Sequence, residues 1–130
     1  MRGNALFLSI LYPQILRKRP FYKDIGVYRA TLNNEIVYIG KATELNNGGF
    51  RKRLRDYTRV SDSARNYPSG RLMHEHRNEV IIEITIAEKS EEGVLATEKL
   101  ELELIQKYNP YWNTLDNGLS RSKLRRIKPK

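Results

Sequence analysis

The stretch GVYRATLNNEIVYIGK, residues 26–41, decides the fold because it reads as a β-hairpin. Residues of high β-propensity stand on both sides of Asn33-Asn34, and asparagine tolerates the left-handed backbone that tight turns require. Each arm carries a tyrosine close to a glycine: Tyr28 in the first arm and Tyr38 in the second, where Lys41 follows at once. Tyrosine in a strand is ordinarily just a good sheet former, so the pair indicates a site only if both side chains reach the same face.

The register of this hairpin determines where the two tyrosines point, because successive side chains of a strand alternate between faces. A two-residue loop places Leu32 opposite Glu35 and sends the tyrosines to opposite faces. A three-residue loop that includes Glu35 places Tyr28 opposite Gly40 and brings both tyrosines to one face. Only the second register builds a site, and the facing glycine would leave room for a phenol ring.

The remaining elements follow from periodicity and turn signals. We expect strands over about 25–32, 36–42 and 80–87, a basic helix over 50–58, a loop over 61–70, a short helix over 71–78, and a long helix from the N-cap Ser90 to Tyr108. This order predicts an α/β (α+β) domain, with a three-stranded, largely antiparallel sheet flanked by helices.

The chain ends are expected to lie outside this domain. Residues 25–115 form the predicted domain, residues 1–24 an N-terminal extension, and residues 116–130 a basic tail. The apolar run Ala5–Leu11 is expected to form a short helix packed on the domain. It is too short to cross a bilayer, and no small-residue cleavage site follows it, so no membrane partner is predicted.

Composition narrows the class of partner. Lys and Arg outnumber Asp and Glu by 24 to 15, and the formal net charge is +9. An excess of this kind on a small domain favours a polyanionic partner, and a nucleic acid is the expected one, with mere solubility as the alternative. The absence of cysteine excludes disulfides, thiol nucleophiles and cysteine-based zinc sites, and it fits a protein of the reducing cytoplasm.

Two acidic residues lie where apolar residues are expected. On a helical wheel of residues 91–108, Glu98 and Glu101 fall inside an apolar arc that includes Leu95 and Leu102, and Glu101 lies near its middle. A core-facing carboxylate is costly unless it is paired, protonated or bound to metal. The structural alternatives are an ion pair with an arginine or an unburied helix edge. The functional alternative is a carboxylate on a cleft floor that binds a divalent ion, with Glu101 the stronger candidate.

Five pieces in order resemble the GIY-YIG nuclease family: GVY, YIGK, the helix FRKRLRDY, a helical glutamate and NPYWN. The resemblance runs from about Gly26 to Asn113, and it is closest to the nuclease domain at the start of the incision protein of bacterial excision repair. It implies a metal-dependent endonuclease that hydrolyses phosphodiester bonds in DNA, with one Mg²⁺ or Mn²⁺ ion per site. The positions that match the family's catalytic residues are Tyr28, Tyr38, Lys41, Arg53, Tyr57, Glu101 and Asn113.

The resemblance also implies a role for each of these residues. Glu101 is the metal ligand. Tyr28 orients or deprotonates the attacking water, with help from Lys41, and Arg53 donates to the phosphate oxygens. The remaining tyrosines, Tyr38 and Tyr57, position water or phosphate, and Asn113 braces the site.

Contacts to the DNA backbone are expected from basic residues outside the catalytic set: Arg51, Lys52, Arg55, Arg59, Arg65, Arg71, Arg121, Lys123, Arg125 and Arg126. Weak sequence preference, or selection of nicks, branches or flaps, is expected, and a partner protein could supply specificity. A catalytically silent binding module, a nuclease that depends on a partner and a protein-binding adaptor remain alternatives. A repair, restriction, phage or mobile-element role stays open. The histidines His74 and His76 are expected at the surface rather than on a metal.

Overall fold

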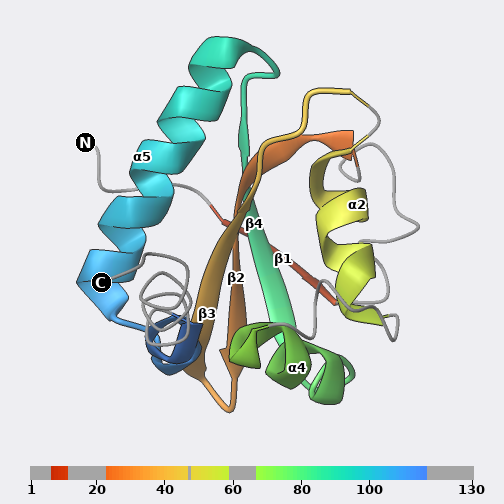
Figure 1. Ribbon diagram of the computed structural model, residues 1–130, viewed down its shortest axis with the longest axis vertical. Coiled ribbons are helices and arrows are strands. Elements are labelled where there is room, and N and C mark those ends of the chain that lie inside the picture. Colours follow the sequence, from red (N-terminus) through yellow and green to blue (C-terminus); the bar gives the residue numbers. More distant parts are fainter. Residues whose placement is uncertain (1–6, 12–22, 47, 59–66, 117–130) are drawn as a thin grey trace, which may run out of the picture.

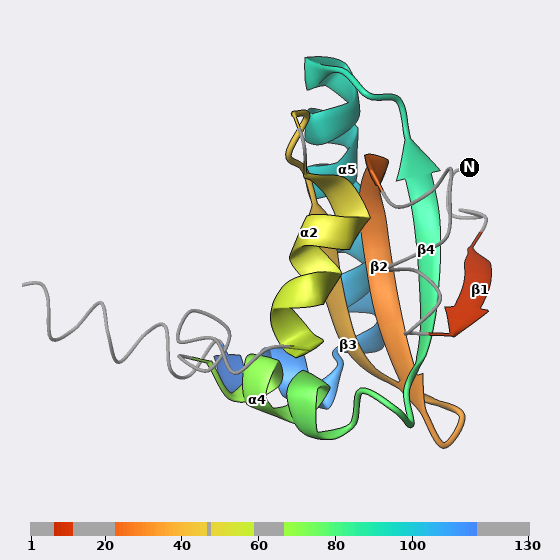
Figure 2. The same ribbon diagram turned by 90° about the vertical axis from the view of Figure 1, so that its right-hand side faces the viewer.

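A computed structural model describes residues 7–11, 23–46, 48–58 and 67–116, with no side-chain description for residues 8–11. Its centre is a four-stranded antiparallel sheet in the order β1-β4-β2-β3 (Figure 2). The strands are β1 (Leu8–Leu11), β2 (Ile25–Leu32), β3 (Glu35–Ala42) and β4 (Ile81–Ala87). The helices are α2 (Gly49–Arg55), the 3₁₀ turn η2 (Asp56–Thr58), α4 (Pro68–Glu75) and α5 (Glu91–Tyr108), and residues 111–116 are also helical.

The predicted fold class is confirmed, and the three predicted strands are all present. The prediction of a helix over Ala5–Leu11 is wrong where the structure describes it, because Leu8–Leu11 forms β1. This strand pairs antiparallel with β4, from Leu8 opposite Ile84 to Leu11 opposite Ile81. A short apolar run makes a marginal helix on its own, whereas the exposed edge of β4 offers it a row of backbone hydrogen bonds. The N-terminal segment therefore adds a fourth strand to the sheet.

The hairpin combines parts of both predicted registers. Its turn has two residues, since Asn33 and Asn34 have φ values of 53° and 68° and Leu32 pairs with Glu35. The register then shifts between Ala30 and Thr31, so that Ala30 pairs with Tyr38 and Tyr28 with Gly40. A β-bulge therefore restores the pairing that the sequence associates with a longer loop.

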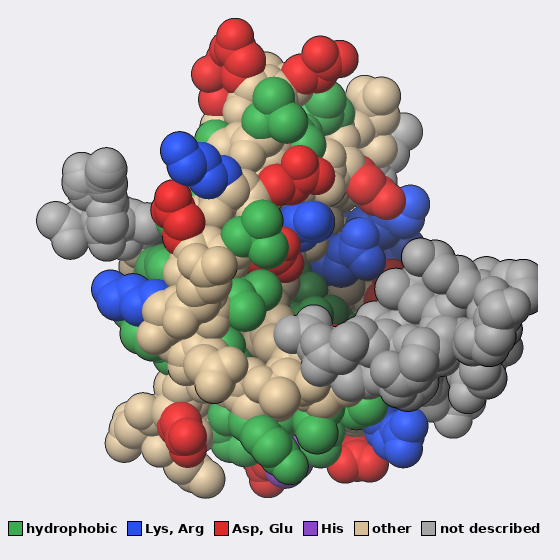
Figure 3. Space-filling model, turned by 60° about the vertical axis from the view of Figure 1, so that its left-hand side comes forward, with side chains coloured by type: hydrophobic (Ala, Val, Ile, Leu, Met, Phe, Trp, Pro, Cys, Tyr) green, Lys and Arg blue, Asp and Glu red, His purple; other side chains and the backbone are tan. Residues whose placement is uncertain are grey.

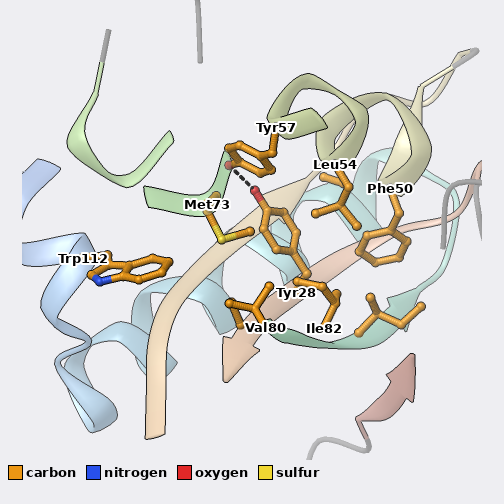
Figure 4. Packing of buried hydrophobic residues seen from close by; sticks show 11 residues of the cluster. Tyr28, Phe50, Leu54, Tyr57, Met73, Val80, Ile82 and Trp112 are labelled. Atoms are coloured by element: carbon orange, nitrogen blue, oxygen red, sulfur yellow. Dashed lines mark hydrogen bonds between the residues drawn. The ribbon is translucent and has the colours of Figure 1, made fainter. Parts of the chain in front are cut away.

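Helices cover both faces of the sheet (Figure 1). On one face α5 packs through Leu104 against Val27 and Ile39. On the other face, Phe50 and Leu54 of α2 and Met73 of α4 pack around Tyr28 and the β4 isoleucines, and Trp112 joins the same cluster (Figure 4). The strand at the other edge, β3, is flanked by α5 on one side and α2 on the other (Figure 1).

The boundaries of α5 agree with the sequence prediction, but its buried face is narrower. Ser90 caps the helix by accepting a hydrogen bond from the Gly93 amide at 3.1 Å, and Asn109 ends it in the left-handed conformation. Leu95 and Leu102, which the wheel placed on the apolar arc, are 66% and 61% exposed. The buried stripe runs instead through Gly93, Thr97 and Leu104, and Glu101 lies at its border.

Two smaller boundaries also differ from expectation. The basic helix is α-helical only to Arg55 and ends in the 3₁₀ turn η2. The segment expected to be a loop up to residue 70 becomes helical at Pro68, which occupies the first turn of α4. Proline is tolerated there because the backbone N–H that it lacks would have no partner within the helix. The turn η2 packs against α4.

Candidate active site

The first half of the site is a cluster of three tyrosines from three elements. Tyr28 of β2 and Tyr38 of β3 have ring centroids 6.2 Å apart, and Tyr57 of η2 lies edge-on to Tyr28 at 6.4 Å. The hydroxyls of Tyr28 and Tyr57 share a buried hydrogen bond of 2.8 Å (Figure 4). The bulge in the hairpin makes this cluster possible, because it brings Tyr28 and Tyr38 to the same face.

Gly40 provides the space for the Tyr28 ring. A Cβ atom at Gly40 would lie 2.6 Å from both Cζ and Oη of Tyr28, closer than real side chains approach. This agrees with the expectation that the facing glycine makes room for a phenol. The glycine of the second motif is therefore required by packing inside the site.

Burial raises the pKa of two of the tyrosines. The pKa of Tyr57 is raised well above its ordinary value, first by burial and then by its neighbour Tyr28. The pKa of Tyr38 is raised by burial and by the nearby Tyr57 and Asp116. At neutral pH both groups are therefore neutral phenols, which can each donate one hydrogen bond and accept others.

The second half of the site lies on the opposite face of β3, beside α5. The Lys41 ammonium is 3.5 Å from the Glu101 carboxylate and 4.0 Å from that of Glu98. The Glu101 side chain is 15% exposed, whereas that of Glu98 is 44% exposed. Burial raises the pKa of Glu101, and the Lys41 cation counteracts this rise. The acid is therefore ion-paired, as the structural alternative expected, but its partner is Lys41 instead of an arginine.

Arg53 connects the two halves electrostatically. It lies on α2 with an exposed side chain, near enough to Tyr28 and Tyr57 to interact with both. Partial shielding from water lowers the pKa of Arg53, but these tyrosines and Glu44 more than offset that effect, so its pKa is raised overall. The same guanidinium helps to lower the pKa of Glu101. Arg53 is therefore a permanent cation within electrostatic reach of both the tyrosines and the carboxylate.

Asn113 ties the helical residues 111–116 to the middle of β3. Its amide nitrogen donates to the Ile39 carbonyl oxygen and its amide oxygen accepts from the Ile39 amide nitrogen, both at 2.9 Å. Ile39 lies between Tyr38 and Gly40, so the two hydrogen bonds hold the strand where the motif residues stand. These two hydrogen bonds therefore brace β3 next to the motif residues.

Three residues near the tyrosines were not singled out by the sequence as site residues. His74 of α4 shares a 2.7 Å hydrogen bond with the backbone carbonyl of Tyr57, which fixes the position of η2. Ser69 of α4 hydrogen-bonds to the Asp116 carboxylate through its amide at 3.0 Å and through its hydroxyl. No local sequence pattern predicts these contacts, because they join segments that are distant in sequence.

The predicted DNA-contacting residues divide into two groups. Lys52 and Arg71 are exposed, Arg51 and Arg55 are half-buried, and Lys52 also pairs with Glu44 at 3.3 Å. The others, Arg59, Arg65, Arg121, Lys123, Arg125 and Arg126, lie outside the described residues.

The described residues do not account for the positive net charge of the chain. They contain 12 basic and 14 acidic residues, a formal charge of −2 against +9 for the whole chain. On the face seen in Figure 3, Lys and Arg side chains adjoin Asp and Glu side chains instead of forming a continuous basic surface. The excess of basic residues therefore belongs to the parts of the sequence outside the described residues.

The part of the chain that the structure describes offers no ready-made metal cage and no membrane helix. No group of three or more His, Cys, Asp or Glu side chains in these ranges comes together as a metal site. A helix long and apolar enough to cross a bilayer is likewise missing from them.

Comparison with known proteins gives the same fold. Residues 24–114 match the family described as the UvrC-like GIY-YIG domain. A similar solved structure is the GIY-YIG N-terminal endonuclease domain of UvrC from Thermotoga maritima, bound to its catalytic magnesium. It is 24% identical with a TM-score of 0.56, and the match covers 78% of this chain and 93% of that one. A search of curated proteins found no match.

Proposed function

Because this chain belongs to the UvrC-like GIY-YIG family of phosphodiester-hydrolysing endonucleases, we propose that it is a divalent-metal-dependent DNA endonuclease acting at the edge of β3. The observation that carries the proposal is the arrangement around this strand. The hydrogen-bonded pair Tyr28 and Tyr57 lies on one side, the Glu101 carboxylate on the other, and Arg53 interacts with both.

The residues present fit a Mg²⁺ or Mn²⁺ ion, one per site. Glu101 is a half-buried carboxylate whose ion pair with Lys41 is loose at 3.5 Å, so the lysine can exchange the carboxylate for a phosphate oxygen. Magnesium is commonly held by one or two carboxylates together with water and substrate phosphate. When bound, the ion would supply charge neutralisation at the scissile phosphate and the leaving oxygen.

The residues of this chain account for the remaining requirements of hydrolysis. Arg53 donates to the phosphate oxygens as negative charge grows on them. Tyr28 accepts a hydrogen bond from the attacking water and orients it, and the cation that interacts with Tyr28 is Arg53. Lys41, whose contacts are to Glu101 and Glu98, is better placed to serve the phosphate than to assist Tyr28.

The charge distribution suggests how DNA is held. A body with a formal charge of −2 gains little from non-specific attraction to phosphates, so affinity must come from the flanking basic segments or from a partner protein. We therefore propose weak sequence preference or selection of DNA structure, with the domain supplying the cut rather than the specificity.

The test is nicking of supercoiled plasmid in Mg²⁺ and in EDTA by the wild type, Tyr28→Phe and Tyr111→Phe. Tyr111 is 66% exposed and serves as a matched control. Metal-dependent nicking that is lost in Tyr28→Phe and kept in Tyr111→Phe supports the proposal. DNA binding without cleavage by the wild type, across several metals and across nicked, branched and flapped substrates, would point to a silent binding module instead.

A further inference from the structure

A buried hydroxyl without a partner lies one helical turn from Glu101, and the proposed function does not use it. Thr97 of α5 is 2% exposed, and its Oγ1 atom has no hydrogen-bond partner among the residues that the structure describes. A buried hydroxyl without a hydrogen bond is unfavourable, and native structures contain few of them. Valine has nearly the same shape and would avoid this cost, so the threonine requires another explanation.

The usual local partner of a helical threonine does not account for Thr97. A threonine hydroxyl inside a helix commonly donates to the carbonyl oxygen four residues earlier. Thr114 makes this contact, since its Oγ1 donates to the Pro110 carbonyl oxygen at 3.3 Å. Thr97 makes no such bond to Gly93, so its proton is not committed within its own helix.

The side chain one turn further along the same face of α5 is Glu101. Residues four apart on a helix have Cβ atoms about 5–6 Å apart. Helical side chains also lean toward the N-terminus, so Glu101 leans back toward the turn that contains Thr97. In the structure, its carboxylate lies 3.5 Å from the Lys41 ammonium and makes no bond to the hydroxyl. An uncommitted donor and a carboxylate are therefore neighbours that are not hydrogen-bonded to each other.

Metal binding by Glu101 would create a need for this donor. Carboxylates that hold a metal ion are themselves hydrogen-bonded, and these bonds fix their orientation. After burial, the groups that act on the pKa of Glu101 are Lys41, Glu98 and Arg53. The two cations serve the phosphate in the proposed function, and an ionised Glu98 only accepts hydrogen bonds. Among the described neighbours of this carboxylate, Thr97 is therefore the donor that stays available.

We propose that Thr97 is a positioning residue, whose hydroxyl donates to the Glu101 carboxylate when that carboxylate binds the divalent ion. This inference rests on the proposed function and extends it to a residue outside the seven positions that match the family's catalytic residues. When Thr97 holds one carboxylate oxygen, the other oxygen can face the ion and Lys41 is released to the phosphate. Thr97 touches neither the ion nor the substrate and acts through Glu101.

The decisive variant is Thr97→Val, because it removes the hydroxyl with little change in shape. It should raise the dissociation constant for Mg²⁺ about tenfold, as the loss of a hydrogen bond to a metal ligand typically does. In the absence of metal, the same variant should raise the midpoint of urea unfolding by about 0.5 M, because it removes an unsatisfied polar group. A merely structural hydroxyl would not shift these two quantities in this way.

An NMR titration with Mg²⁺, followed through the backbone amide signals of α5, measures the dissociation constant without DNA or cleavage. Glu101→Gln identifies the site, and Thr97→Val should have no further effect in that background. Thr97→Ser keeps the donor and should bind Mg²⁺ as tightly as the wild type does. Thr114→Val is the matched control, because it removes a hydroxyl that has a partner. It should leave Mg²⁺ binding unchanged and should not raise the urea midpoint.

These readouts keep the role of Thr97 distinct from the proposed function. If the wild type binds Mg²⁺ about tenfold more tightly than Thr97→Val but does not cleave DNA, the nuclease proposal fails and the positioning role stands. The positioning role is overturned if Thr97→Val binds Mg²⁺ as tightly as the wild type, or if Thr97→Ser loses as much affinity. A lower urea midpoint for Thr97→Val, or no saturable Mg²⁺ shift in the wild type, would overturn it as well.

Discussion

Replacement of Gly40 by alanine should destabilise the fold and reduce activity, although a Gly→Ala change at a position of ordinary φ usually stabilises a protein. Among the described glycines, positive φ values occur at Gly26 and Gly49, so the backbone of Gly40 accepts an alanine without strain. At such positions Gly→Ala usually stabilises a protein by about 0.4–1 kcal/mol. Here the new Cβ would lie 2.6 Å from Cζ and Oη of Tyr28, and that side chain is 1% exposed, so the sign should reverse.

The size of the loss in stability and activity depends on how far the Tyr28 ring is displaced by the new Cβ atom. Overpacking of a tight core costs about 1–3 kcal/mol, and losing the Tyr28–Tyr57 hydrogen bond costs about 1 kcal/mol, so Gly40→Ala should lower the free energy of unfolding by about 2–4 kcal/mol. Displacement of a reacting group by about 1 Å can reduce the rate about 100-fold, and we expect a cleavage loss of that order.

Urea unfolding and single-turnover cleavage measure these two effects. Because Tyr28→Phe removes one of the two close atoms, Gly40→Ala should cost less in that background. A Gly40→Ala protein that is as stable and as active as the wild type would refute the packing argument.

Three further predictions concern other parts of the site. Asn113→Ala leaves the Ile39 amide and carbonyl without their partner, so urea unfolding should show a loss of about 2 kcal/mol, and a loss below about 0.5 kcal/mol would contradict the bracing role. Since burial raises the pKa of Glu101, its folded form holds the proton more tightly, and its contribution to stability is present at low pH and lost as pH rises through the folded pKa. Unfolding measured across this range should show that decline in wild type but not in Glu101→Gln, and identical profiles would contradict the burial of the carboxylate. Replacing Arg121, Lys123, Arg125 and Arg126 together by glutamine should weaken binding to duplex DNA and reduce the slope of log affinity against log salt by about 3–4, and an unchanged slope would remove them from the interface.

Much of the fold could be predicted because its signals are local. The boundaries of β2 and α5, the Ser90 cap and the Asn109 end all follow from propensity and turn chemistry within a few residues. The hairpin was predictable only as a pair of alternatives, since a bulge depends on how β3 meets the rest of the structure. The register that the bulge produces brings Tyr28 and Tyr38 to the same face, as the three-residue loop would have done.

The parts that could not be predicted depend on contacts between distant segments. The strand β1 forms because β4 has an open edge, which no periodicity in the N-terminal run reveals. The wheel of α5 placed Glu101 near the middle of an apolar arc, yet the helix buries only a narrow stripe. The link between Ser69 and Asp116 spans 47 positions of sequence and carries no motif.

The measurement that tests the central claim most directly is single-turnover cleavage of labelled duplex DNA in Mg²⁺ by Glu101→Gln and Glu98→Gln. Both glutamates lie on α5 and both face Lys41, at 3.5 Å and 4.0 Å, so the substitutions match in charge and position. We predict that Glu101→Gln abolishes cleavage while Glu98→Gln cleaves at close to the wild-type rate. Equal activity of the two variants would contradict the assignment of Glu101 as the carboxylate that holds the metal.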